Sequence, residues 1–328
     1  MTGYDVIGDV HGHADKLEGL LWILGYRHTA GAWRHPSRQA VFIGDLIDRG
    51  PQQLETVALV RDMVDSGSAQ MVLGNHEFNA VAYWTSDPDQ PGEHLRRHTA
   101  KNRSQHQTFL DAVGDDRILH RRLTDWFMTV PLWLDLGGLR IVHACWDPRS
   151  MVVITELLAS SESPANSLTE ELVISSSRPD HRAYAAVETL LKGPEIPLGA
   201  GRAYVDKDGH VREQARFQWW SPAATTLRAG AAIPGGATGI DGRPFTSLPE
   251  DPITVDTPAL YTDDVPVIFG HYWRTGTPGI LNPKAACVDY SVANGGPLVA
   301  YRWSFETDLH SDNFATFPDH FRGSRSTV

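Results

Sequence analysis

An alternation of short apolar runs with helical patterns over residues 4–75 constrains the fold more than any other feature of the sequence. The apolar runs have the length of buried strands and cover residues 4–8, 40–44 and 69–74. Between them, residues 14–24 repeat leucine at helical spacing before Gly25, and a second helical pattern opens at Pro51 and closes at Gly67. Strands that alternate with helices of this length predict a parallel sheet with right-handed crossovers. Functional residues of such sheets gather at the carboxyl ends of the strands.

The remainder of the chain changes character twice. Residues 92–128 are polar and helix-prone, and two strand patterns joined by a pair of glycines follow them. Strand patterns return later in "VPVIFGH", "AACVDYSV" and "PLVAYRW". Residues 150–260 mix helical patterns with loops rich in proline and glycine, so we expect an insertion or cap there. We therefore predict one domain over residues 1–310 and a loose C-terminal tail over residues 311–328.

The composition limits the partners and the compartment. The 328 residues carry a net charge of −11, which argues against tight binding to long nucleic acid but allows a local cationic site for a small phosphorylated substrate. The two cysteines, Cys145 and Cys287, form no metal-type pair and lie in apolar contexts, so we expect buried free thiols in a reducing compartment. No apolar run reaches membrane-spanning length, and the first strand pattern begins without a signal-like segment. We therefore predict a cytoplasmic protein that does not contact the membrane.

Side chains that can bind metal ions follow the strand patterns. They stand in "GDVHGH", "GDLIDRGP" and "GNHE", and two later strand patterns end in His143 and His271. Taken singly, an aspartate at a strand end is commonly a helix cap, and a histidine is more often structural than a ligand. Five such strand ends on the same edge of one sheet are hard to explain in that way. Asp9 and His11 are two residues apart, so their side chains would leave an extended backbone on the same side.

The residue types also indicate a chemistry. Mixed oxygen and imidazole ligands suit Mn²⁺, Fe or Zn²⁺. Two such ions about 3.5–4 Å apart can clamp a phosphoryl group and generate a hydroxide nucleophile. Asn75 would supply a neutral oxygen ligand, and His76 could carry protons beside it. The sequence thus predicts a two-metal site for phosphoryl chemistry, with Mn²⁺ as the first choice of metal.

The order GDxHG, GDxxDRG and GNHE, followed by two histidines, resembles the signature of the calcineurin-like metallophosphoesterases. Within them it is similar to the PPP-type serine/threonine phosphatases and their bacterial relatives. Those relatives include dinucleoside-polyphosphate hydrolases and the phosphatase module of bacterial RNA-repair enzymes. The resemblance is specific over residues 5–78 and extends through His143 and His271, whereas residues 150–260 carry no motif that can be matched. It implies an α/β fold in which two mixed sheets form a β-sandwich flanked by helices, with an inserted α+β cap.

The resemblance also implies a role for each motif residue. One metal ion would be bound by Asp9 and His11 and the other by Asn75, His143 and His271, with Asp45 bridging both. Arg49 would grip phosphate oxygens, and His76, paired with Asp48, would protonate the leaving group. Two divalent ions against two aspartates and one hydroxide leave about one net positive charge, which favours a phosphate dianion. The simpler alternatives are a surface salt bridge for Arg49 and helix capping for Asp48.

The region 150–260 offers weaker candidates for substrate binding. Phosphatases of this family often use a further arginine from the later half of the chain, and "VREQARFQWW" contains Arg212 and Arg216, of which we favour Arg216. Tyr272, next to His271, could edge the site or simply pack. The group of tryptophans at 219, 220, 273 and 303 is expected to pack in the core and cap rather than to stack on bases.

Three functions remain open at this point. The first is a two-metal phosphoesterase that hydrolyses phosphomonoesters by attack of a metal-bound hydroxide, with phosphoserine or phosphothreonine of proteins as the expected substrate. The second is a dinucleoside-polyphosphate hydrolase or a phosphodiesterase on small nucleotides. The Asp48–Arg49 pair argues against a symmetrical diadenosine tetraphosphatase, because those enzymes replace this aspartate. It leaves the asymmetrical class open. The third is an inactive scaffold, which would be expected to have lost metal ligands, and none of the expected ones is missing.

Overall fold

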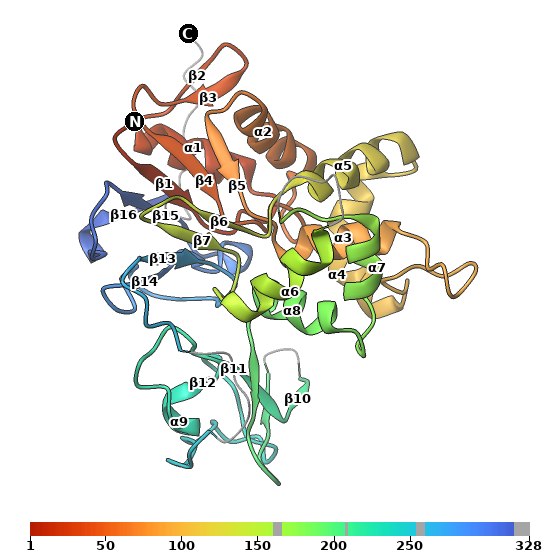
Figure 1. The fold of residues 1–328 in the computed structure, drawn as a ribbon, viewed down its shortest axis with the longest axis vertical. Helices are drawn as coiled ribbons and strands as arrows, with labels where there is room; N and C mark the ends of the chain where they lie inside the picture. The colour runs from red at the N-terminus through yellow and green to blue at the C-terminus, as the bar shows by residue number, and fades with distance from the viewer. Residues whose placement is uncertain (160–165, 207–208, 254–259, 318–328) are drawn as a thin grey trace.

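A computed structural model describes residues 1–159, 166–206, 209–253 and 260–317, and two mixed sheets form its centre (Figure 1). The first sheet has the order β16-β15-β1-β4-β5. Its strands are β1 (Tyr4–Ile7), β4 (Gln39–Phe42), β5 (Ala69–Met71), β15 (Leu298–Trp303) and β16 (Phe314–Phe317). The first three are parallel, as their helical connections α1 (Ala14–Leu24) and α2 (Gln53–Asp65) predict, and β15 pairs antiparallel with both β1 and β16.

The second sheet has the order β14-β13-β7-β6. Its strands are β6 (Trp133–Asp135), β7 (Arg140–Val142), β13 (Val267–Phe269) and β14 (Ala285–Cys287). β7, β13 and β14 are parallel, and β6 pairs antiparallel with β7 through the glycine turn predicted from the sequence. Because β13 pairs directly with β7, everything between Val142 and Val267 is one long connection between neighbouring strands.

The strands alternate between two cores because successive side chains point to opposite faces. On one face of the first sheet, Val6 and Val41 join Ile141 and Ile268 of the second sheet in an apolar cluster between the sheets. On the other face, Phe42 belongs to the larger cluster that includes the buried sides of the helices. The predicted sandwich of two mixed sheets flanked by helices is therefore confirmed.

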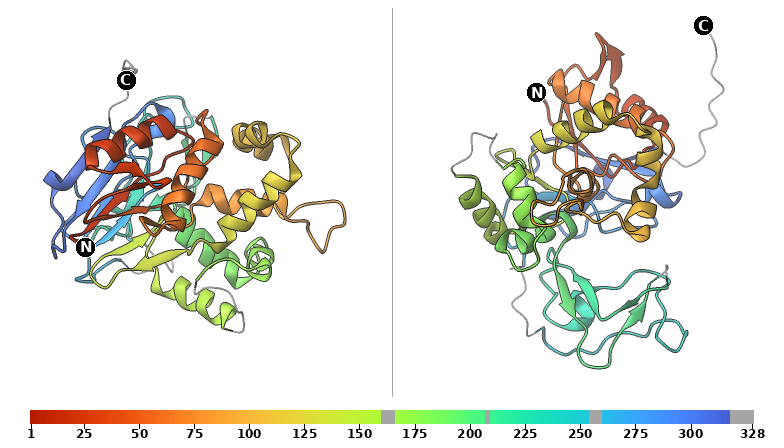
Figure 2. Two further views of the ribbon diagram at one scale, coloured as in Figure 1. Left: turned by 90° about the horizontal axis from the view of Figure 1, so that it is seen from above. Right: turned by 90° about the vertical axis from the view of Figure 1, so that its right-hand side faces the viewer.

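The helices cover the outer faces of the sandwich (Figure 2). A hairpin of β2 (Arg27–Thr29) and β3 (Ala32–Arg34) follows α1 and precedes β4. Beyond α1 and α2, the helices are α3 (Asn75–Trp84), α4 (Ala100–Val113), α5 (Arg117–Thr129), α6 (Pro148–Leu158), α7 (Glu170–Ser176) and α8 (Arg182–Lys192). In Figure 1 the helices α3 to α8 lie to the right of the sheets.

A small region of strands lies below the second sheet in Figure 1 and is built from the middle of the chain. It contains β8 (Glu195–Pro197), β9 (Tyr204–Val205), β10 (Val211–Arg212), β11 (Gln214–Phe217), α9 (Leu227–Gly230) and β12 (Ala231–Ala232). The strands form a sheet of order β12-β11-β8 and a separate pair, β10-β9. With α6, α7 and α8 it accounts for the described part of residues 150–260, the segment that the sequence predicts to be a cap.

Two expectations need correction. The five strand ends that carry metal-type ligands belong to two sheets and not to one, since β7 and β13 lie in the second sheet. The predicted tail also begins too early, because β16 pairs with β15 and Phe317 packs against Gly19 of α1. The apolar signal for this short strand is a phenylalanine at each of its ends. Residues 318–328 of the predicted tail lie outside the described residues.

Two smaller expectations concern the thiols and membranes. Both cysteines are free and buried, as expected, and burial raises the pKa of each thiol well above its usual range. Among the described helices, none combines the length and the apolar character needed to cross a membrane.

Candidate functional site

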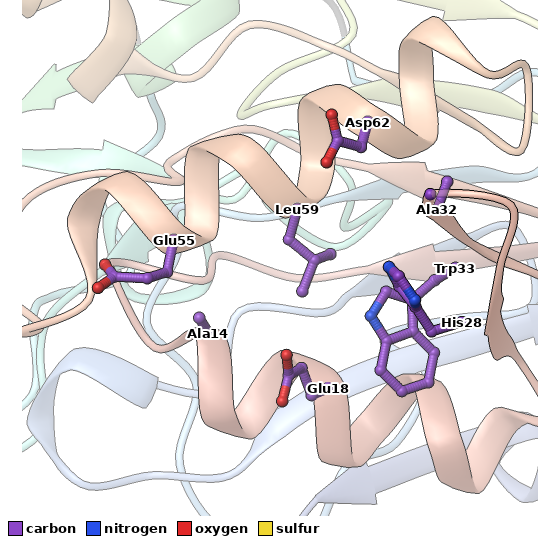
Figure 3. Close-up of a pocket in the computed structure, with 9 residues that line it drawn as sticks. Ala14, Glu18, His28, Ala32, Trp33, Glu55, Leu59 and Asp62 are labelled. Carbon is purple, nitrogen blue, oxygen red and sulfur yellow. The ribbon is translucent and has the colours of Figure 1, made fainter.

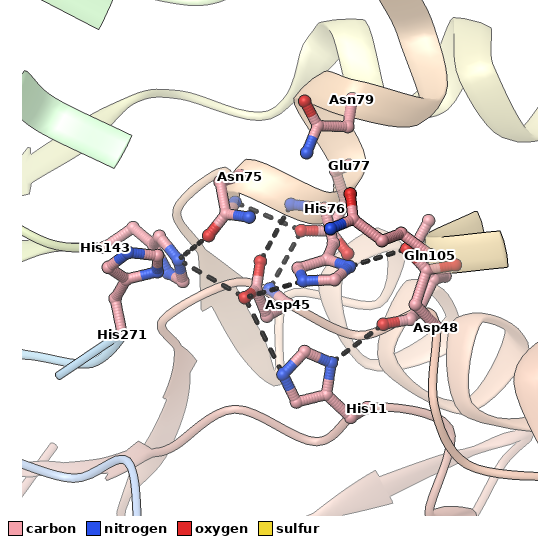
Figure 4. Close-up of polar contacts among 12 residues, drawn as sticks. His11, Asp45, Asp48, Asn75, His76, Glu77, Asn79, Gln105, His143 and His271 are labelled. Carbon is pink, nitrogen blue, oxygen red and sulfur yellow. Dashed lines mark hydrogen bonds and ion pairs between the residues drawn. The ribbon is translucent and has the colours of Figure 1, made fainter. Parts of the chain in front are cut away.

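Residues from both sheets meet where their parallel strands end (Figure 4). Asp9 and Asp45 follow β1 and β4, and α3 begins with Asn75 directly after β5. His143 and His271 follow β7 and β13 of the second sheet. The two sheets therefore contribute their carboxyl ends to one site.

Asp45 lies at the centre of this site. Its Oδ2 lies 3.8 Å from Nε2 of His11, 3.5 Å from Nε2 of His143 and 3.9 Å from Nε2 of His76. Two sets of potential ligands share it: one with His11 and His76, the other with His143 and His271, each with its atoms within 4.8 Å of one another. A carboxylate shared by two such sets has the position expected of a bridging ligand.

The histidines are oriented toward this centre by backbone carbonyls. Nδ1 of His11 donates to the carbonyl oxygen of Ile47 at 2.9 Å, and Nδ1 of His143 donates to that of Ile43 at 2.7 Å. Each hydrogen bond fixes the ring so that Nε2 is directed at Asp45, which is how metal-binding histidines are usually held. Nε2 of His143 also lies 3.1 Å from the amide oxygen of Asn75.

Buried atoms without a partner show that the donor set fits cations. Among the described residues, none hydrogen-bonds to either carboxylate oxygen of Asp9 or to Nε2 of His271, although all three atoms are buried. Such atoms are costly unless something pairs with them. Burial, together with the nearby Asp289 and Asp45, raises the pKa of Asp9 well above its usual range. A bound cation would relieve this repulsion between carboxylates and satisfy the bare atoms.

The backbone at the site is strained. His11, Asp45, Asp48, Arg49 and His271 have φ angles of 46°, 51°, 67°, 74° and 65°, in the left-handed region that side chains usually avoid. Such strain persists where the surrounding structure fixes it and gathers at functional sites. The φ of His11 also corrects one expectation, because the segment from Asp9 to His11 is not extended.

Glu77, the last residue of the "GNHE" motif, has a structural role that the sequence did not reveal. It is fully buried, and its carboxylate accepts hydrogen bonds from the backbone N–H groups of Asp45, Leu46 and Gly74 at 2.8, 2.8 and 3.1 Å. It therefore ties the end of β4 to the start of α3 and fixes the backbone of the central ligand. The available signal was the spacing of Gly74 and Glu77, which lets the Glu77 carboxylate accept from the backbone N–H of the N-cap residue.

His76 and Asp48 form the pair that the motif implies. Nδ1 of His76 lies 2.5 Å from Oδ2 of Asp48, and its Nε2 faces the ligand cluster. Burial opposes a charge on His76, but Asp45 and the hydrogen bond to Asp48 outweigh it and raise the pKa of His76 to about 9. Nε2 of this imidazole is therefore directed at the metal-binding centre, and Asp48 holds the other ring nitrogen.

The second oxygen of Asp48 has a partner that the sequence did not reveal. Nδ1 of His106, on α4, lies 2.8 Å from Oδ1 of Asp48. His106 is one histidine among several in a polar helical segment, so no local pattern distinguishes it. Asp48 is buried, yet the hydrogen bonds from His106 and His76 hold its pKa well below the usual range.

The predicted substrate-binding residues adjoin the ligand cluster in different ways. Arg49 is exposed, and within the described parts of the chain nothing forms an ion pair with it. Arg216, on β11, donates from Nη1 to the carbonyl oxygen of His271 at 3.1 Å, so it reaches the ligand cluster from the middle region. Tyr272 is buried and donates its hydroxyl to the carbonyl oxygen of Phe217, which attaches β11 to the same turn. A contact of Tyr272 with substrate stays a prediction.

Three of these four tryptophans are buried and one is exposed. Those at positions 219, 220 and 303 are buried in the apolar cores, as expected. Trp273 differs, since its side chain is 45% exposed and the Arg216 guanidinium lies 5.6 Å from its ring centre. Trp273 is therefore partly exposed beside Arg216, two residues after His271.

A surface pocket of about 180 Å³ lies elsewhere, between α1, α2 and the β2–β3 hairpin (Figure 3). Its lining includes Glu18, Glu55, Asp62, His28 and Trp33 and none of the residues at the strand ends. The donor cluster is thus separate from this pocket.

Comparison with known families agrees with the geometry. The model of the calcineurin-like phosphoesterases matches residues 4–198, more than half of the chain. The chain belongs to this family. Members of this family use a binuclear centre of divalent metal ions, and the matched residues include every potential ligand discussed above except His271.

Several curated relatives carry the name asymmetrical bis(5′-nucleosyl)-tetraphosphatase. The chain is 33% identical to the one from Oceanobacillus iheyensis over 141 residues, 43% of this chain and 54% of the relative. It is 37% identical to the one from Bacillus subtilis over 148 residues, 43% of this chain and 57% of the relative. The chain thus spans little more than half the length of these relatives.

Two further similarities extend over nearly the whole chain. A symmetrical bis(5′-nucleosyl)-tetraphosphatase from Vibrio cholerae is 26% identical over 330 residues, which cover 97% of this chain and 100% of the relative. The structure of a protein serine/threonine phosphatase from Saccharomyces cerevisiae has a TM-score of 0.47 and 14% identity, and the alignment covers 97% of this chain and 80% of that one.

Proposed function

We propose that this phosphoesterase hydrolyses phosphate monoesters with alkyl leaving groups, such as phosphoserine or phosphothreonine in proteins. The observation that carries the proposal is the His76–Asp48 pair beside the shared ligand Asp45. A histidine that can donate a proton matters most where the leaving group is a poor one, as a serine alkoxide is. We further propose Mn²⁺ as the native metal, with Fe or Zn²⁺ as alternatives, and the cytoplasm as the compartment.

The residues of the site would bind the metal ions and the phosphate group. Asp9, His11 and Asp45 would hold one cation, and Asp45, Asn75, His143 and His271 the other. When bound, two divalent ions polarise a phosphoryl group and lower the pKa of a bound water molecule. Arg49, which has no ion-pair partner among the described residues, would bind the phosphate oxygens, and Arg216 would be the second arginine to do so.

The leaving group would receive its proton from His76. Its Nε2 faces the cluster, and Asp48 fixes the other ring nitrogen, so the proton-bearing atom has one direction in which to donate. The carboxylate also stabilises the charged imidazole by opposite charge. This arrangement separates the acid from the groups that bind the phosphate.

A substrate panel tests the proposal. The metal-loaded protein would be assayed on a phosphoserine peptide, p-nitrophenyl phosphate, diadenosine tetraphosphate and a 2′,3′-cyclic nucleotide, with Asp45→Asn as the control that removes the central ligand. We expect metal-dependent hydrolysis of the peptide and of the aryl ester. Hydrolysis of the nucleotides alone would contradict the proposed substrate class.

The second candidate is asymmetrical hydrolysis of dinucleoside tetraphosphates, and the names of the curated relatives favour it. Asymmetrical cleavage of diadenosine tetraphosphate would release AMP and ATP, whereas symmetrical cleavage would release ADP alone. The product pattern therefore identifies this activity directly. A polyphosphate leaving group is stable without a proton, so this substrate would depend less on His76.

A further inference from the structure

We propose that His106 is a positioning residue of the active site, which holds the Asp48 carboxylate so that His76 points its proton at the leaving group. The inference rests on the proposed function, since it assigns His106 to the proton-donating pair of that function. It concerns a hydrogen bond between residues that are 58 positions apart in the sequence and come from different elements.

Both oxygens of the Asp48 carboxylate accept hydrogen bonds. Oδ2 lies 2.5 Å from Nδ1 of His76, and Oδ1 lies 2.8 Å from Nδ1 of His106. An ionised carboxylate only accepts hydrogen bonds, so Nδ1 of each histidine must carry the proton in these contacts. The backbone N–H of Asp48 is in turn held by Oε1 of Gln53 at 2.7 Å. Both carboxylate oxygens and the backbone of Asp48 are thereby held by hydrogen bonds.

His106 itself is held by ring packing. Its ring stacks on Phe109 at 4.8 Å between centres with 24° between the planes, and it lies 5.4 Å from the ring of Tyr83. Only 3% of the residue is exposed, and in the described structure its Nε2 has no hydrogen-bond partner. Among the described residues, the one hydrogen bond of this imidazole is therefore the one to Asp48, and a residue that merely filled the core would not need it.

The consequence for catalysis follows from the geometry. With Oδ1 fixed by His106, the plane of the carboxylate is set, and Oδ2 then sets the plane of the His76 ring. If Oδ1 were free, the carboxylate could rotate, and the His76 ring would lose its alignment with the cluster. A small misplacement of a catalytic group lowers the rate without changing how the phosphate is bound.

Two substitutions separate this role from core packing. His106→Phe keeps a ring of similar size and removes the donor, whereas His106→Asn keeps an N–H close to the position of Nδ1. His120 offers a matched control, because it packs against Phe109 in the same aromatic cluster and does not contact Asp48. His120→Phe should therefore leave the activity unchanged.

The kinetic test compares two substrates of the metal-loaded protein. We expect His106→Phe to lower kcat on a phosphoserine peptide about 10-fold, as loss of a hydrogen bond to a charged group predicts, with KM unchanged and a smaller loss on p-nitrophenyl phosphate. His106→Asn should recover much of the loss, and His106→Phe should cost nothing further in an Asp48→Asn background. Equal losses on both substrates, or a further loss in that background, would overturn the proposal.

A second readout needs no turnover. In ¹⁵N-histidine-labelled protein loaded with diamagnetic Zn²⁺, long-range ¹H–¹⁵N spectra should show His106 protonated at Nδ1 and bare at Nε2. His106→Phe should shift the ring-nitrogen signals of His76, and His120→Phe should not. A His106 protonated only at Nε2 would refute the inference even if the protein proved inactive on every substrate, so failure of the inference and failure of the proposed function can be told apart.

Discussion

Replacement of His76 by asparagine separates proton donation from metal binding. The structure places Nδ1 of His76 2.5 Å from Asp48 and its Nε2 3.9 Å from Oδ2 of Asp45, so the ring lies beside the ligand cluster with Nε2 directed toward it. Attack on phosphoserine leaves an alkoxide that needs this proton as the bond breaks. A p-nitrophenyl ester leaves as a stable phenolate and needs it far less.

The magnitude follows from the role. General acid catalysis typically contributes about 10²–10⁴-fold, so His76→Asn should lower kcat on a phosphoserine peptide by that factor and on p-nitrophenyl phosphate by distinctly less. Asp48→Asn should show the same pattern more weakly, since the histidine remains. Loss of the hydrogen bond to a charged partner suggests about 10–100-fold for that variant.

The assay is steady-state kinetics on both substrates, with metal content measured in the same preparations. His94→Asn provides a control, because His94 lies in another part of the chain and stacks on His98. The reasoning would be refuted if His76→Asn slowed both substrates equally, or if the variant lost its metal. Either result would assign His76 to phosphate or metal binding.

Three further predictions concern Arg216, Glu77 and the two cysteines. Arg216→Ala should lower kcat/KM for phosphate esters about 10–100-fold, while Arg212→Ala, whose partner is Asp206, should not; equal effects would remove Arg216 from the site. Glu77→Gln should lower the free energy of unfolding by about 1.5–3 kcal/mol in urea titrations, because its amide group would face a backbone donor, and an unchanged midpoint would contradict this. The two buried cysteines should react with maleimide only after unfolding, since burial raises the pKa of both thiols and lowers the fraction of thiolate, and rapid labelling of the native protein would show otherwise.

The sequence predicted the parts of the site that follow strands directly. Asp9, Asp45 and Asn75 come at the ends of apolar runs that form parallel strands, and local spacing is enough to place them at one edge. His143 and His271 were also predicted as ligands, but the sequence did not indicate that their strands belong to a second sheet. Local patterns carry no information about which strands pair across a long connection, and β7 pairs with β13 across the whole middle region.

Contacts distant in sequence and unusual backbone angles explain the other differences. His106 reaches Asp48 only through tertiary packing, so its role could not be read from α4 alone. The left-handed φ of His11 is imposed by the site and contradicts the extended backbone that its spacing suggested. β16 was assigned to the tail because a short strand at the edge of a sheet needs only a few apolar residues.

The metal content of the purified protein tests the central claim most directly. Elemental analysis of wild-type protein produced with Mn²⁺ should find about two divalent ions per chain, as a shared carboxylate between two ligand sets requires. Asp9→Asn should mainly empty the site of His11, and Asp45→Asn should weaken both sites and abolish turnover together. Wild-type protein without stoichiometric metal, or Asp45→Asn protein with full metal content and activity, would contradict the two-metal account.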